Sequence, residues 1–315
     1  MKYVFIVNPA SGQGKNKKEL VPRIEQLMKE HPDKDIKIYY TRGEKDATVL
    51  ADQILKETED KVTVFACGGD GTIHEVVNGV YGHDNAVLAV VPVGSGNDFA
   101  RALGGGLNEG VKYKNLSAHI DAPIKKIDLI KMTWEENGKE VCHICDNGIN
   151  IGFDGNACIR AHELKAIPGV SGTGSYILAV TQCLALKKGE DLKITADGEV
   201  VHDGPLLLTT VGNGGFCGGG FESCPRADLS DGLLELLVVN NISRAKFVSM
   251  VPKYKGGKIF DIDDQGGKLY KYRQAKKIEI EPNNGKMKYV GDGETFETGK
   301  LTIEVVKDAI DVVYL

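Results

Sequence analysis

The sequence predicts an N-terminal α/β domain with an open, mostly parallel sheet, followed by a mainly antiparallel β-sandwich domain. The length of 315 residues suits about two domains at roughly 150 residues each. Apolar strands alternate with amphipathic helices in the first third, and strands with turn signals dominate from Lys125 onward. We place the domains at 1–125 and 126–300, and expect the strand-like segment 301–315 to pack back on the first domain.

Four strands and four helices alternate in the first domain. Apolar runs predict strands at 2–8, 35–41, 61–67 and 86–91. Apolar residues at helical spacing predict helices at 18–30, 47–58 and 73–80, and a short helix that ends near Leu103. Apolar strands joined by helices are typical of a parallel sheet that is covered on both faces.

Strands outnumber helices in the second domain. We expect strands at 127–134, 140–147, 191–196, 204–213, 233–240, 276–281 and 287–290, and helices at 155–166 and 171–187. Asp197-Gly198 and Asn283-Asn284-Gly285 are hairpin turn signals. This pattern favours an antiparallel sandwich.

The composition is that of a globular protein, with 42% hydrophobic and 26% charged residues. A net charge of -5 argues against a nucleic-acid partner, which needs a basic surplus. The longest apolar run, 86–93, is far shorter than the ~20 residues of a membrane span. The apolar start, 3–7, is too short for a signal peptide. We therefore expect a cytoplasmic protein, and we read its 7 cysteines as free thiols.

One cysteine pair, Cys142 and Cys145 around His143, has the look of half a zinc site. The segment reads as a strand, in which an offset of three puts the two sulfurs on opposite faces. A second pair at metal-site spacing is missing from the sequence. We therefore expect no zinc here.

Glycine is enriched, at 39 of 315 residues, and the glycines cluster. A P-loop is excluded, because Pro9 stands at its first glycine and Asn16 at its Ser/Thr position. A dinucleotide fingerprint is excluded as well, because Gly94-Ser95-Gly96 continues to Phe99 where glycine is needed.

Three glycine-containing loops follow strands of the predicted parallel sheet, at 8–12, 68–72 and 94–98. Ligands bind beyond the carboxyl ends of such strands, so the loops are expected to converge. Glycines let backbone N–H groups approach phosphate, and the carboxylates of Asp70 and Asp98 next to phosphate suggest Mg²⁺. The alternative is a set of tight turns in which the aspartates cap helices.

These loops resemble the catalytic domain of diacylglycerol and sphingosine kinases, most of all its soluble bacterial members. The resemblance rests on Asn8-Pro9 with Ser11-Gly12, on Gly68-Gly69-Asp70-Gly71-Thr72 followed by Glu75-Val76, and on Pro92 to Ala100 with Asn97-Asp98-Phe99. It continues with Gly218-Gly219-Gly220, Pro225, Ala227, Asp231-Gly232-x-Leu234 and Asp292-Gly293-Glu294. It therefore covers nearly the whole chain.

The resemblance implies ATP as phosphoryl donor and a lipid hydroxyl as acceptor. It assigns the nucleotide contacts to Asn8, Pro9, Ala10, Ser11, Gly12, Thr41, Gly69, Asp70, Gly71, Thr72, Ile73, His74, Glu75 and Ser95. Position 74 is often asparagine in the family, so His74 is a departure, and a packed or solvent-facing histidine is the alternative to a functional one. A Mg²⁺ ion in the second domain is implied at the Asp231 carboxylate and the carbonyls of Asp228 and Leu233, where the alternative is a plain hairpin turn.

The resemblance also assigns the catalytic carboxylates. Asp292 is implied as the base that accepts the hydroxyl proton, with Glu294 in support, and Asp70, Asp98 and Asp128 as an acidic network around the ATP-bound Mg²⁺. The identical tripeptide Asp197-Gly198-Glu199 is expected to be only a hairpin turn. We choose Asp292 over Asp197 because of its position near the end of the chain, since the tripeptide itself occurs at both places.

The sequence thus favours an ATP-dependent lipid kinase that converts diacylglycerol to phosphatidic acid. Alternatives are another acceptor (sphingoid base, phosphatidylglycerol, monoacylglycerol or a soluble alcohol) and a nucleotide-binding regulator without turnover. NAD kinases share a related glycine loop but fit the other motifs poorly. The edges of the sandwich leave a homodimer open.

Two segments are candidates for contact with lipid. Basic residues interleave with apolar ones from Arg244 to Lys258, which suits peripheral docking on anionic lipid or a solvated helix face. An apolar stripe of Tyr176, Ile177, Val180 and Leu184 suits either core or a lipid pocket.

Overall fold

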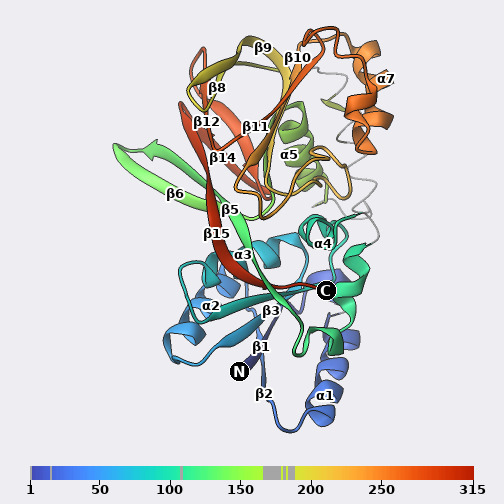
Figure 1. Cartoon of the computed structure of the whole chain (residues 1–315), viewed down its shortest axis with the longest axis vertical. Coiled ribbons are helices and arrows are strands. Elements are labelled where there is room, and N and C mark those ends of the chain that lie inside the picture. Colours follow the sequence, from blue (N-terminus) through green and yellow to red (C-terminus); the bar gives the residue numbers. More distant parts are fainter. Residues whose placement is uncertain (1, 15, 107–108, 166–178, 180–181, 184–188) are drawn as a thin grey trace. The chain divides into compact units, whose positions relative to one another are not determined.

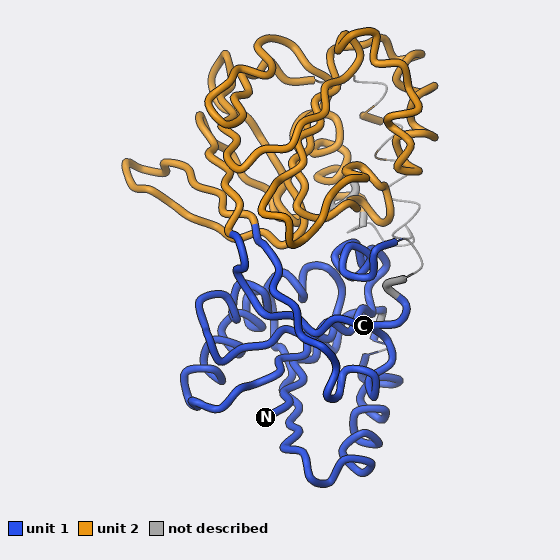
Figure 2. Tube along the Cα trace, in the orientation of Figure 1, with its two compact units in different colours: residues 1–129, 307–315 blue, residues 130–306 orange. Residues whose placement is uncertain are grey.

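The computed structural model describes residues 2–14, 16–106, 109–165, 179, 182–183 and 189–315. The chain forms two compact units, which Figure 2 shows in different colours. Unit 1 comprises residues 1–129 and 307–315, and unit 2 comprises residues 130–306. Two long strands, β5 (Ile124–Glu136) and β15 (Leu301–Val313), carry the chain between the units.

Unit 1 contains a parallel sheet with the strand order β4-β3-β1-β2. Its strands are β1 (Lys2–Val7), β2 (Asp35–Tyr40), β3 (Val62–Gly68) and β4 (Ala86–Pro92). Asp311 and Val312 at the end of β15 pair in parallel with β4. The predicted parallel sheet is confirmed, and all of its strands run toward the same edge.

Helices cover both faces of this sheet (Figure 1). They are α1 (Val21–Glu30), α2 (Asp46–Lys56), α3 (Asp70–Val80) and α4 (Asp98–Gly104). Tyr3, Phe5 and Val7 share a buried cluster with α1, and the alternate residues of β1 are buried on the other face, as the period of a strand requires. The apolar strands therefore reflect burial on both sides.

Short irregular helices complete unit 1. They are η1 (Ser11–Gly14), η2 (Asn16–Leu20), η3 (Glu109–Lys114) and η4 (Ser117–His119). The helix predicted at 18–30 is regular only from Val21, after the π-helical turn η2. Pro22 lies in the first turn of α1, where its missing N–H is tolerated.

Unit 2 is an antiparallel β-sandwich, as predicted. Its other strands are β6 (Lys139–Cys145), β7 (Gly148–Gly152), β8 (Glu190–Ala196), β9 (Glu199–Gly212), β10 (Leu234–Asn240), β11 (Tyr270–Ala275), β12 (Lys277–Pro282), β13 (Met287–Gly291) and β14 (Glu294–Thr298). The order is β14-β13-β7-β9-β8-β12-β15, and β10 pairs with β9 and β11. One buried cluster joins β5, β7, β8, β10, β12, β13 and β15 as the core.

In the described part of unit 2, two helices and a 3-10 turn flank the sandwich. They are α5 (Phe153–Lys165), α7 (Arg244–Lys255) and η5 (Ile259–Asp261). Both helices contribute to a second buried cluster with apolar residues of β9 and β10. The helix predicted at 171–187, with its apolar stripe, lies outside the described residues apart from Ala179, Gln182 and Cys183. Among the described residues, every helix is too short or too polar to span a bilayer.

The strands that sequence periodicity missed are short. β7 begins and ends with glycine, β11 (YKYRQA) is largely polar, and β14 carries two glutamates in its five residues, so none of the three shows an apolar run. In β6 the strand reading is confirmed, because Cys142 is exposed and Cys145 is buried.

Candidate active site

The loops that follow β1, β3 and β4 contact one another at the carboxyl edge of the unit 1 sheet. Asn8 Nδ2 donates to Thr72 Oγ1 at 3.1 Å, which links the first loop to the second. The Val93 amide donates to the carbonyl of Gly68 at 2.8 Å, which links the second loop to the third. Backbone amides at such an edge, followed by the starts of α3 and α4, form a site that suits phosphate.

Asp70 fixes the third loop to the second. Its Oδ2 accepts from the Asn97 amide and its Oδ1 from the Asp98 amide, both at 2.7 Å. Burial raises the pKa of Asp70 to about 6, the nearby Asp98 carboxylate adds to this rise, and the amides oppose it. Asp70 therefore caps the start of α4 from a distance, which is the structural role that the sequence left open.

Asp98 is 7% exposed and pairs with Arg101 one turn along α4. The distance from Arg101 Nη1 to Asp98 Oδ1 is 2.8 Å, and the same nitrogen donates to the carbonyl of Gly96. Sequence reasoning missed Arg101, although its spacing of three residues from Asp98 is a usable helical signal. The guanidinium adds a positive charge at the carboxyl edge of the sheet.

Two glycines let the second and third loops approach closely. A Cβ on Gly94 would lie 2.6 Å from Gly69 Cα, and a Cβ on Gly69 would lie 3.3 Å from Gly94 Cα. A Cβ on Gly96 would lie 2.3 Å from Asp70 Oδ2. Gly94 and Gly69 therefore allow a close backbone contact, and Gly96 leaves room for the Asp70 carboxylate, in addition to any approach of a ligand.

The other residues assigned to the nucleotide differ in exposure. Ala10, Gly71 and Ser95 are exposed, and Asn8, Pro9, Ser11, Gly12 and Gly69 are half-buried. Ile73 is fully buried and Thr41 is 8% exposed, with its amide bound to the carbonyl of Val7. At these two buried positions a ligand could contact only the backbone atoms.

Glu75 and His74 have partners within unit 1. Glu75 Oε2 accepts from the Ala47 amide at 3.1 Å and so caps the start of α2. His74 is 3% exposed, and its Nε2 lies 3.4 Å from Asn78 Nδ2 one turn along α3. His74 is therefore packed in the structure, and its contact with the nucleotide stays a prediction.

Asn16 is a buried residue that sequence reasoning did not select for the site. Its side chain is 0% exposed, and Nδ2 donates to the carbonyl of Asn8 at 2.7 Å and to that of Cys67 at 3.0 Å. These carbonyls lie at the ends of β1 and β3, just before the first two loops. Asn16 therefore holds the two loops in register.

We predict that Asn16→Leu weakens nucleotide binding as well as stability. The change leaves two buried carbonyls without a donor, at about 1–3 kcal/mol each. Asn85→Leu is the matched control, because Asn85 Nδ2 bridges the carbonyls of Leu55 and Thr58 in the same unit. Both variants should unfold at lower denaturant, and only Asn16→Leu should raise the KM for ATP. An equal rise in both would contradict a positioning role.

Asp128 lies apart from the loops in the chain, on β5. It is 0% exposed, and its Oδ1 accepts from the amide of Asp308 at 2.8 Å. Asp308 has a positive φ of 51°, so this bond secures an irregular point in β15. Of the three carboxylates expected in one acidic network, Asp70 and Asp98 are brought together. The Asp128 bond supports the pairing of β5 with β15, and its part in the network stays a prediction.

Asp292 is held by backbone amides in unit 2. It begins the turn from β13 to β14 with a φ of 44°. Its carboxylate accepts from the amides of Asp146 at 2.6 Å, Asn147 at 3.2 Å and Gly148 at 2.8 Å. Asn147 Nδ2 in turn donates to the carbonyl of Phe216 at 2.6 Å. Both the position and the orientation of the carboxylate are therefore fixed.

The second copy of the tripeptide has a similar arrangement. Asp197 begins the β8–β9 turn with a φ of 47°, and its Oδ1 accepts from the amides of Lys276 and Lys277 at 3.0 and 2.9 Å. The expected hairpin is confirmed. An aspartate whose carboxylate accepts from backbone amides in such a turn is therefore not by itself evidence of a catalytic role. Asp292 has to be distinguished from Asp197 by the residues around it.

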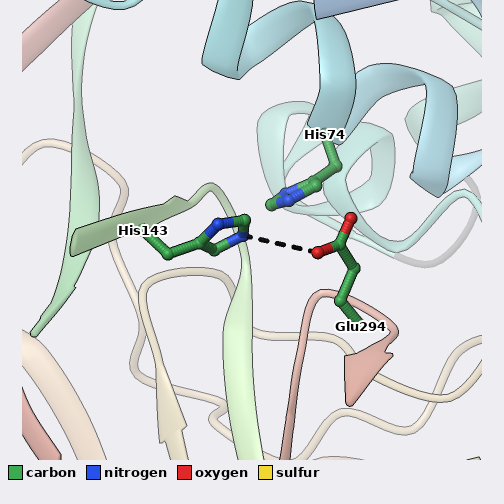
Figure 3. A group of neighbouring side chains, drawn as sticks. All are labelled: His74, His143 and Glu294. Atoms are coloured by element: carbon green, nitrogen blue, oxygen red, sulfur yellow. Dashed lines mark ion pairs between the residues drawn. The ribbon is translucent and has the colours of Figure 1, made fainter. Parts of the chain in front are cut away.

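A histidine and a glutamate lie beside the Asp292 turn. Glu294, the first residue of β14, lies 4.0 Å from His143 Nε2, and Figure 3 marks this ion pair with a dashed line. The His143 ring also packs against Phe296, with a centroid distance of 5.1 Å. Figure 3 also draws His74, which belongs to unit 1.

The loop before β10 supplies oxygen ligands only. Asp228 and Asp231 are exposed, and each accepts a bond from an amide two residues on, at 3.0 Å from Ser230 and 2.9 Å from Leu233. Gly232 has a φ of 75°, which tightens the turn. Carboxylate and carbonyl oxygens in a tight turn are a donor set that fits Mg²⁺.

The basic segment 244–258 is mostly the helix α7. Its apolar residues Phe247 and Met250 are 5% and 3% exposed and pack inward, whereas Val248 is 50% exposed. Most of the apolar side chains expected to flank a membrane patch therefore belong to the core. The basic residues lie on the exposed side of the helix.

Comparison with known proteins agrees with this geometry. Residues 2–132 match the family model of the diacylglycerol kinase catalytic domain, and residues 147–314 match the YegS C-terminal NAD kinase beta sandwich-like domain. A diacylglycerol kinase of Bacillus subtilis is 28% identical over 92% of this chain and 88% of that protein. One from Staphylococcus aureus is 30% identical over 77% of this chain and 71% of that protein.

Solved structures show the same fold. A diacylglycerol kinase from Bacillus anthracis has a TM-score of 0.70 and 26% identity, covering 100% of this chain and 97% of that one. A yeast NADH kinase has a TM-score of 0.55 at 10% identity, covering 100% of this chain and 84% of that one, and so shares the fold alone.

The fold, the glycine loops and these matches define a kinase. The chain belongs to the diacylglycerol kinase family.

Proposed function

We propose that this protein transfers the γ-phosphoryl group of ATP to a lipid hydroxyl, converting diacylglycerol to phosphatidic acid. The observation that carries the proposal is the contact among the three loops at the carboxyl ends of β1, β3 and β4. Backbone amides at that edge would bind the phosphates of ATP, with Ser95 and Arg101 as polar side chains nearby. The family relatives named diacylglycerol kinase support the choice of acceptor.

The reaction forms a bond between the acceptor oxygen and the γ-phosphorus and breaks the bond to the bridging oxygen of ADP. We assign Asp292 as the group that orients the hydroxyl and accepts its proton, because the family resemblance assigns it and because Glu294 and His143 form an ion pair beside its turn. Mg²⁺ would neutralise the phosphates when bound, and Asp98 with Asp70 would face it. A second Mg²⁺ would be held at Asp228, Asp231 and Leu233, where its role is to order the loop.

We propose a cytoplasmic protein that reaches its lipid at the membrane surface through the basic side of α7. A homodimer through a sandwich edge stays a prediction.

The acceptor is tested by incubating the protein with ATP, Mg²⁺ and mixed micelles that contain one lipid each: diacylglycerol, monoacylglycerol, phosphatidylglycerol, ceramide or sphingosine. We expect phosphorylated diacylglycerol as the main product. A product from another lipid alone would keep the kinase and replace the acceptor. Bound ATP with no lipid product would favour a nucleotide-binding regulator.

A further inference from the structure

The segment that supplies amides to the Asp292 carboxylate is itself bonded to the loop that follows β9. This segment consists of residues 146–148, and we call it the amide segment. The carbonyl of Asn147 accepts from the amides of Asn213 and Gly214, both at 2.9 Å. Asn147 therefore binds the carboxylate through its amide and the following loop through its carbonyl.

Two asparagine side chains add bonds in opposite directions between the same two segments. Asn213 is 1% exposed, and its Nδ2 donates to the carbonyl of Asp146 at 3.0 Å. Asn147 Nδ2 donates the other way, to the carbonyl of Phe216 at 2.6 Å. The amide segment and residues 213–216, which we call the β9 loop, are thus joined by backbone and side-chain bonds together.

A third segment fixes the β9 loop. The amide of Cys224, a residue that is 0% exposed, donates to the carbonyl of Gly215 at 3.1 Å. A Cβ on Gly215 would lie 3.1 Å from the Cys224 carbonyl oxygen, and a Cβ on Gly212 would lie 2.8 Å from Cys224 Sγ. The β9 loop is therefore packed closely against a buried residue, and it can support the amide segment.

The Asp197 turn, which has the same tripeptide, is built differently. The residues that supply its amides are Lys276 and Lys277, and their carbonyls accept from the backbone amides of Val305 and Asp197 at 3.0 and 2.9 Å. Among the described residues, the two bonds from asparagine side chains belong to the Asp292 turn and not to this one. The tripeptide turn thus forms without such bonds, and the support at Asp292 needs another explanation.

We infer that Asn213 is a positioning residue for the Asp292 carboxylate, because its bond to the Asp146 carbonyl fixes the amides that orient this group. The inference rests on the proposed kinase function, in which Asp292 accepts the hydroxyl proton. A reacting group that is misplaced by about 1 Å can cost about 10²-fold in rate. Asn213 therefore acts on the chemical step through Asp292, and it leaves the binding of ATP to unit 1.

The test compares Asn213→Ala with wild type in diacylglycerol phosphorylation and in amide hydrogen exchange. The variant lacks the donor to the Asp146 carbonyl, so the amides of residues 146–148 should exchange faster. We expect kcat to fall about 10- to 100-fold, while the KM for ATP changes less than about twofold. Asn147→Ala removes the bond to the Phe216 carbonyl, should act in the same direction, and serves if Asn213→Ala does not fold.

Asn240→Ala is the matched control. Asn240 ends β10 in the same unit, and its Nδ2 donates to the carbonyls of Gly267 and Lys268 at 3.0 and 2.9 Å. This variant should lower the unfolding midpoint, but leave kcat and the exchange at residues 146–148 unchanged.

Three results would overturn the inference. They are normal kcat in Asn213→Ala, an equal fall of kcat in Asn240→Ala, and unchanged exchange at residues 146–148 in Asn213→Ala. A wild type that binds ATP and phosphorylates no lipid would instead reject the proposed kinase function, on which the catalytic part of the inference rests.

Discussion

Asp292→Asn should remove turnover and leave ATP binding intact. The amide side chain cannot accept the hydroxyl proton, and loss of such a base costs ~10² to 10⁴-fold in rate. The turn itself should persist, because the one side-chain oxygen of asparagine can still accept from the amide of Asp146 or of Gly148, which bind different oxygens of the carboxylate, and asparagine tolerates the positive φ of 44°. Rate and ATP affinity are measured separately, by lipid phosphorylation and by equilibrium binding.

The chain supplies its own control for this substitution. Asp197→Asn changes the same tripeptide in another hairpin, where Oδ1 accepts from both amides, so it controls for the tripeptide and for its turn. We expect near wild-type turnover for Asp197→Asn. Similar losses in the two variants, or normal turnover in Asp292→Asn, would remove the catalytic assignment.

Gly94→Ala should have the largest effect on nucleotide binding. Its Cβ would lie 2.6 Å from Gly69 Cα, a backbone atom that cannot rotate away, so the second and third loops must separate. Overpacking of this kind costs about 1–3 kcal/mol. We expect at least a tenfold rise in the Kd for ATP, at about 1.4 kcal/mol per tenfold, measured by titration calorimetry.

Gly299→Ala is the control for Gly94→Ala. A Cβ on Gly299 would meet only the Gly285 carbonyl, at an ordinary contact distance of 3.9 Å, and Gly299 belongs to unit 2, whereas the glycine loops belong to unit 1. It should leave ATP affinity unchanged. If Gly94→Ala keeps wild-type affinity while its unfolding midpoint falls, the loops serve stability and do not form the nucleotide site.

Much of the fold could be predicted because its signals are local. The strands β1, β3 and β4 are buried on both faces and read as apolar runs, and α2 shows clear helical spacing. β7, β11 and β14 were missed because they are short and rich in glycine or polar residues. In such strands the pairing partners decide the structure, and the partners are distant in the sequence.

The glycine loops were predictable from spacing, whereas their supports were not. Asn16 binds carbonyls of residues 8 and 67, and the second of these is 51 residues away. Asp128 and Glu75 entered the site by resemblance alone, and each has a backbone amide as partner, at Asp308 and Ala47. A sequence motif shows which residue types are present, but only the folded chain shows which side chains hold the loops in place.

The most direct test of the account follows the fate of the phosphoryl group. Diacylglycerol micelles are incubated with the protein, Mg²⁺ and ATP that carries a radiolabel either at the γ-phosphorus or at the α-phosphorus, and the lipid is extracted. The account predicts label in phosphatidic acid from the γ-labelled ATP only, and none of it with Asp292→Asn. Lipid that stays unlabelled while the protein binds ATP, or label that persists with Asp292→Asn, would contradict it.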